Sequence, residues 1–100
     1  MTVHHMEISE LQIAKFCQAK GIRRLALFGS VLREDFRPDS DVDVLVEFLP
    51  GVRVGLAFIR IQDELSALLG RSVDLHTAGS LSKYFRNQVL KEMETLYVAA

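Results

Sequence analysis

The segment covering residues 41–48 constrains the fold more than any other part of this sequence. Four apolar residues alternate there with four others: Val42, Val44, Val46 and Phe48 alternate with Asp41, Asp43, Leu45 and Glu47. A period of two predicts a β-strand with one wholly apolar face, and Pro50-Gly51 predicts a turn after it. An apolar sheet face must be buried against another layer, so the rest of the chain has to supply elements that cover it.

The other segments with clear periodicity include helices that could form this covering layer. Apolar residues at helical spacing predict three helices and one shorter helical turn, at residues 9–20, 54–69, 81–92 and 31–36. Ser9 and Ser80 are the expected N-caps of the first and last helix, and Gly21 is the expected end of the first. Short apolar runs predict three further strands, at residues 25–28, 73–75 and 95–98. This order predicts a small α/β (α+β) domain with helices packed on one face of a sheet.

Length and composition exclude several classes of protein. A chain of 100 residues has room for one domain, and residues 1–100 are interpreted as a single one. The net charge of −1 and the 25% of charged residues exclude a disordered chain and a basic arm for nucleic acid. No apolar run approaches the roughly 20 residues of a membrane span, and the single cysteine, Cys17, cannot form an intramolecular disulfide. We therefore expect a cytoplasmic protein that contacts neither membrane nor nucleic acid directly.

Gly29 and Ser30 lie between a predicted strand and a predicted helical turn. Glycine lets the backbone approach a ligand closely, and amides at the start of a helix favour an anion. The Ser30 hydroxyl could add a donor to a phosphate oxygen. Taken alone, the dipeptide is better explained by a plain turn, because Gly-Ser turns are common.

Asp41 and Asp43 are separated by two positions on the predicted strand, so their side chains would share a face, about 6.5 Å apart at Cα. Two unpaired carboxylates that close raise each other's pKa, and a divalent cation such as Mg²⁺ relieves the repulsion. A solvated strand face is the alternative. Asp74 would join them if its short strand lies beside theirs. His76, two residues further on, would share the face of Asp74 and could approach this group, but it is interpreted as a polar residue at a strand end.

The order of these motifs resembles a known family. The stretch LALFGSVLREDFRPDSDVDVLVEF, residues 25–48, places Gly-Ser ten residues before Asp-x-Asp. It resembles the signature of the nucleotidyltransferase (DNA polymerase β-like) superfamily, and most of all the minimal nucleotidyltransferase antitoxins that pair with HEPN-domain toxins. The VDLHT strand at residues 73–77 and the C-terminal helix follow in the order expected for that family. The resemblance implies a palm-like mixed β-sheet.

The same resemblance implies a role for each motif residue. Gly29 and Ser30 would hold the phosphates of a nucleotide, and Asp41 and Asp43 would coordinate Mg²⁺. Asp74 would be the third carboxylate of the metal site and the general base toward an incoming hydroxyl.

Two neighbouring residues are less settled by the resemblance. Arg33 could contact phosphate or form a surface salt bridge with Glu34 or Asp35. Glu34 stands where family members often have glycine, so its charge could weaken nucleotide binding or simply face solvent.

The resemblance also implies a reaction, the transfer of AMP from ATP to a tyrosine of a cognate HEPN toxin, which neutralises the toxin. A second hypothesis is that the chain neutralises its toxin by occlusion, without catalysis. A third is nucleotidyl transfer to a small molecule such as an antibiotic, which the short chain disfavours because it leaves little room for an acceptor domain. The protein could form a homo-oligomer.

Overall fold

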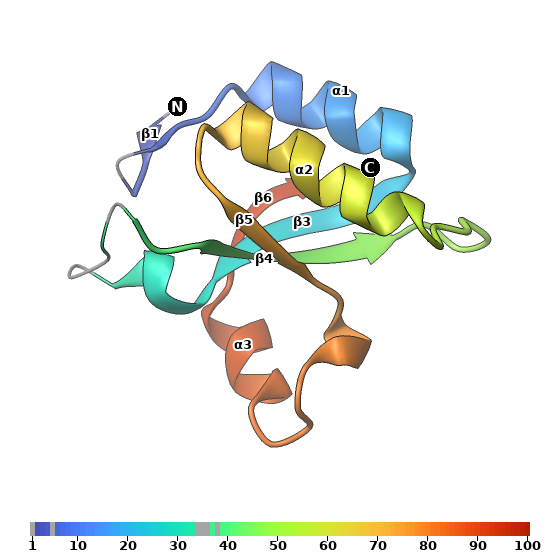
Figure 1. The fold of residues 1–100 in the computed structure, drawn as a ribbon. Helices are drawn as coiled ribbons and strands as arrows, with labels where there is room; N and C mark the ends of the chain where they lie inside the picture. The colour runs from blue at the N-terminus through green and yellow to red at the C-terminus, as the bar shows by residue number, and fades with distance from the viewer. Residues whose placement is uncertain (1, 5, 34–36, 38) are drawn as a thin grey trace.

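The computed structural model describes residues 2–4, 6–33, 37 and 39–100. Its centre is a four-stranded sheet with the strand order β5-β4-β3-β6 (Figure 1). The four strands are β3 (Ile22–Phe28), β4 (Val42–Phe48), β5 (Val73–His76) and β6 (Glu94–Val98). Strand β3 runs antiparallel to both β4 and β6, whereas β4 and β5 are parallel. The predicted fold class, a small mixed α/β sheet, is confirmed.

Two helices cover one face of this sheet, α1 (Glu10–Lys20) and α2 (Ala57–Leu69) (Figure 1). The ends of α1 follow the sequence prediction. The Ser9 side chain accepts a hydrogen bond from the backbone amide of Gln12 at 3.3 Å, and Gly21 ends the helix in the left-handed conformation. A short separate pair of strands, β1 (Thr2–Val3) and β2 (Met6–Glu7), precedes α1 and was not predicted.

The apolar face of β4 lies under these helices. Val42, Val44 and Val46 are essentially inaccessible to solvent and belong to one buried cluster with residues of α1 and α2. The alternation read from the sequence therefore predicts the buried face correctly. The strand begins at Val42, so Asp41 lies just before it rather than inside it.

A smaller apolar cluster lies on the opposite face of the sheet. Its buried members are Phe28, Leu45 and Leu81, and residues of η2 (Ala78–Ser80) and α3 (Arg86–Glu92) pack against it. Figure 1 shows α3 on this side of the sheet. The prediction of helices on one face therefore holds for α1 and α2, and α3 adds partial cover to the other face.

The last helix differs from its prediction. A helix from residue 81 capped by Ser80 is wrong, because Ser80 belongs to a 3₁₀ turn capped by Thr77, and α3 begins only at Arg86. The Ser80 amide and the Thr77 hydroxyl are hydrogen-bonded at 3.2 Å, and the Thr77 amide donates to the Ser80 hydroxyl at 3.1 Å. Leu81 follows in an extended conformation with its side chain buried against the sheet. The chain is therefore extended at Leu81, with this side chain buried, where the sequence predicts the first turn of a helix.

One further prediction is corrected by the structure. The predicted helical turn at residues 31–36 is a 3₁₀ turn, η1 (Gly29–Leu32), and residues 34–36 lie outside the described residues.

No helix in the described part of the chain is both long and apolar enough to cross a membrane.

Candidate active site

The parallel pairing of β4 with β5 brings two carboxylates together. Asp43 and Asp74 are direct partners in the register of these strands. Both side chains point away from the α1 and α2 face, because Val42 and Val44, on either side of Asp43, are buried beneath those helices. The Asp43 side chain is 29% exposed and the Asp74 side chain 52%. The sequence predicts that Asp74 joins the other carboxylates if its strand lies beside theirs, and β5 does lie beside β4.

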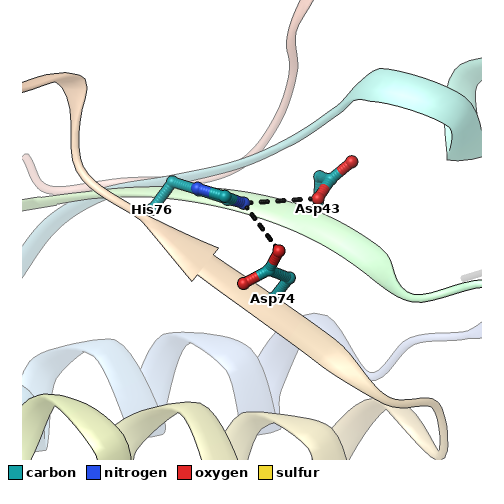
Figure 2. A group of neighbouring side chains, drawn as sticks. All are labelled: Asp43, Asp74 and His76. Carbon is teal, nitrogen blue, oxygen red and sulfur yellow. Dashed lines mark hydrogen bonds and ion pairs between the residues drawn. The ribbon is translucent and has the colours of Figure 1, made fainter. Parts of the chain in front are cut away.

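His76 joins this pair, as Figure 2 shows. Its Nε2 atom lies 3.3 Å from Asp43 Oδ1 and 3.2 Å from Asp74 Oδ2. The ring meets Phe28 of β3 edge-on, with ring centroids 5.2 Å apart. His76 is the last residue of β5, as interpreted from the sequence, and it also reaches both carboxylates, which is the alternative left open for it. The signal for its role was the two-residue spacing from Asp74, which puts both side chains on one strand face.

The electrostatics of this group favour a cation. Burial raises the pKa of Asp43, the charges of Asp74 and Asp41 raise it further, and the hydrogen bond and charge of His76 oppose the rise. Asp43, Asp74 and His76 each offer one ligand atom, and these atoms lie within 4.8 Å of one another. Two carboxylate oxygens and an imidazole nitrogen at this spacing are a suitable donor set for a divalent metal ion.

Gly29 packs directly against this group. Its φ of 77° is in the region that glycine tolerates, and a Cβ atom at this position would lie 2.5 Å from Asp43 Oδ2. Only glycine fits there, for both reasons. Ser30 follows in the 3₁₀ turn η1, where its carbonyl accepts a hydrogen bond from the Arg33 amide at 3.0 Å. The structure thus brings the predicted Gly29-Ser30 turn and Asp43 together.

Asp41 lies at the edge of this arrangement. Its side chain is exposed, and it is outside the group of three ligand atoms, yet its charge is close enough to raise the pKa of Asp43. Arg71 fixes the loop before it, since Nη2 donates to the carbonyls of Arg37 at 3.2 Å and Ser40 at 3.1 Å.

The remaining predicted residues lie beside the 3₁₀ turn. Arg33 follows η1 and is exposed. Glu34 and Asp35, its suggested partners, lie outside the described residues, and so does the departure from the family pattern at Glu34.

Sequence comparison identifies a family model and a relative that match most of the chain. The family model described as "Nucleotidyltransferase domain" matches residues 11–96, which include every residue of the site. The chain is 38% identical over 95 residues to the protein adenylyltransferase MntA of Thermococcus cleftensis, an alignment that covers 93% of this chain and 85% of that protein.

Solved structures show the same architecture. A chain described as a minimal nucleotidyltransferase, a provisional name, is 35% identical, with a TM-score of 0.68 and coverage of 89% of this chain and 88% of that one. A toxin–antitoxin structure with AMP-PNP has a TM-score of 0.70 at 23% identity, covering 92% and 75%. A complex of an MNT antitoxin with a tri-AMPylated HEPN toxin from Shewanella oneidensis has a TM-score of 0.62 at 23% identity, covering 90% and 70%. At 23% identity these two likenesses establish the fold alone. The chain belongs to the nucleotidyltransferase domain family and is a homologue of the protein adenylyltransferase MntA.

Proposed function

We propose that this protein is an antitoxin that transfers AMP from ATP to a tyrosine hydroxyl of a cognate HEPN toxin and requires Mg²⁺ or a similar divalent ion. The observation that carries the proposal is the meeting of Asp43 and Asp74 beside the Gly29 turn. The name of the MntA relative supports the reaction. The AMP-PNP complex and the AMPylated HEPN toxin found with similar folds support ATP and the toxin as its two substrates.

The site residues have separate roles in this reaction. Asp43 and Asp74, with Asp41 at the edge, would hold the metal ion, which supplies positive charge against the phosphates. Gly29 allows the nucleotide to approach the backbone closely, and the Ser30 hydroxyl and the Arg33 guanidinium are the donors proposed for the phosphates.

Asp74 is the residue proposed to accept the proton. Its side chain is the more exposed of the two carboxylates, so an incoming hydroxyl reaches it more easily than Asp43. The tyrosine oxygen forms a bond to the α-phosphorus of ATP, the bond from that phosphorus to pyrophosphate breaks, and the phenol proton passes to Asp74. Positioning and electrostatic stabilisation account for most of the catalysis in such a transfer.

A labelling experiment tests this proposal. The full chain is incubated with Mg²⁺, a candidate cognate HEPN toxin, and ATP labelled at either the α- or the γ-phosphate. We expect the α-label alone to enter the toxin. Asp43→Asn and Asp74→Asn should abolish labelling, whereas Asp63→Asn, an exposed acidic residue of α2, should not change it. Absence of the α-label from the toxin, with a folded wild-type chain, would contradict the proposal.

Neutralisation by occlusion is the second candidate. Exposed apolar side chains favour it, because Tyr84 is 89% exposed, Phe85 47% and Leu90 38% on the α3 side of the sheet. Under this alternative, Asp43→Asn and Asp74→Asn would still neutralise the toxin. Under the catalytic proposal, both variants would bind the toxin without neutralising it.

A further inference from the structure

His76 lies where a third ligand of a metal ion held by Asp43 and Asp74 would lie. Two ligands on neighbouring vertices around one small divalent ion, at bond lengths of about 2.0–2.1 Å, lie about 2.8–3.4 Å apart. The distances of 3.3 and 3.2 Å from His76 Nε2 to oxygens of Asp43 and Asp74 both fall within that range. All three ligand atoms lie within 4.8 Å of one another, so one ion could contact all three once the side chains adjust around it.

The surroundings of His76 hold its imidazole in this place. The edge-on contact with Phe28 limits the rotation of the ring. The outer edge of β5 is tied to α2, since the Leu75 amide donates to Gln62 Oε1 at 2.9 Å and the Val73 amide to Ser66 Oγ at 3.0 Å. These two amides alternate with Asp74 and His76 along the strand, so the bonds that fix the strand also fix the two side chains.

We propose that His76 Nε2 is a direct ligand of the divalent ion held by Asp43 and Asp74. The nitrogen donor shifts the preference of the site from Mg²⁺ toward first-row transition ions such as Mn²⁺, Co²⁺ or Zn²⁺. The reason is the donor set, because Mg²⁺ takes oxygen ligands, whereas imidazole nitrogen suits transition ions. The inference rests on the proposed function, since that function requires an ion at this site.

Electron spin-echo spectroscopy of bound Mn²⁺ tests the ligand directly, and it needs neither nucleotide nor toxin. We expect modulation from a coordinated imidazole nitrogen in the wild-type chain, and a change in its frequencies when histidine is labelled with ¹⁵N. The chain has three histidines. A variant with both His4→Asn and His5→Asn should keep the signal, which assigns it to His76 without changing the site.

Binding titrations test the preference between ions. Replacing His76→Asn should weaken Mn²⁺ binding by about 10-fold or more and Mg²⁺ binding by clearly less, so the ratio of the two affinities falls. The His4→Asn control should leave both affinities unchanged. If His76→Asn does not fold, the spectrum of the His4→Asn/His5→Asn variant still decides whether His76 is a ligand.

The outcomes separate this inference from the proposed function. Bound Mn²⁺ without nitrogen modulation, or equal losses of Mn²⁺ and Mg²⁺ affinity in His76→Asn, would overturn the role of His76 and leave the nucleotidyltransferase proposal intact. Failure of the wild-type chain to bind any divalent ion, with or without ATP, would overturn both.

Discussion

Gly29→Ala tests how closely the phosphate-binding turn and the metal site are coupled. The added Cβ would lie 2.5 Å from Asp43 Oδ2, and φ at this position is 77°. An alanine in the left-handed region costs about 1–2 kcal/mol of stability. Relief of the contact requires the Asp43 carboxylate to move, and overpacking of this kind costs about 1–3 kcal/mol more.

A matched control separates the two contributions. Gly70 has a φ of 69°, and a Cβ added there would have no neighbour within 4 Å. Gly70→Ala should therefore lose only the conformational part, about 1–2 kcal/mol. The excess loss in Gly29→Ala over Gly70→Ala is the cost of the contact with Asp43.

A double-mutant cycle assigns that excess to Asp43. Urea unfolding at neutral pH gives the free energy of unfolding of Gly29→Ala, of Asp43→Ala and of the double variant. In the Asp43→Ala background the carboxylate is absent, and the nearest remaining atom of residue 43 is its Cβ at 3.4 Å. We expect the cost of Gly29→Ala to fall there to that of Gly70→Ala. An excess that persists without the carboxylate, or no excess in the first place, would refute this reasoning.

Three other perturbations have clear expected outcomes. Burial raises the pKa of Asp43, so ionisation of this carboxyl destabilises the folded state as pH rises through that pKa. The free energy of unfolding of Asp43→Asn should therefore increase relative to that of the wild type between acidic and neutral pH, as measured by unfolding titrations. Leu65→Ala removes a fully buried side chain and should cost about 2–5 kcal/mol, whereas Leu56→Ala, at a residue 92% exposed, should change stability by less than about 0.5 kcal/mol in the same assay. Burial raises the pKa of Cys17 to about 12, so iodoacetamide should modify this thiol only in unfolded chain, as followed by mass spectrometry.

Local features of the fold could be predicted because their causes lie within a few residues. The cap at Ser9 and the stop at Gly21 depend on hydrogen bonds and φ values near the helix ends. The buried face of β4 follows from alternation alone. Helical spacing within residues 54–69 predicts that Leu56 and Ile59 lie on the apolar side of the helix together with Leu65, and this prediction is wrong for both, because they are 92% and 62% exposed. The spacing of apolar residues in a helix does not show which of them contact the sheet.

The site was only half predictable for a related reason. Gly29 and Asp43 could be found because they belong to one continuous motif. Asp74 could be named only on the condition that its strand lies beside β4, and the contact of His76 with Asp43 depends on the same condition. The neighbour and direction of that strand are set by tertiary packing, and parallel pairing with β4 places both residues within reach of Asp43. No local pattern determines such a pairing between distant strands.

The intact mass of the HEPN partner tests the central claim most directly. The toxin is purified after incubation with this chain, ATP and the divalent ion, and then weighed and fragmented. We predict a mass increase equal to one or more adenylyl groups, located on tyrosine, and no increase with Asp43→Asn although the complex still forms. A toxin that is neutralised by the wild-type chain at unchanged mass would contradict the claim.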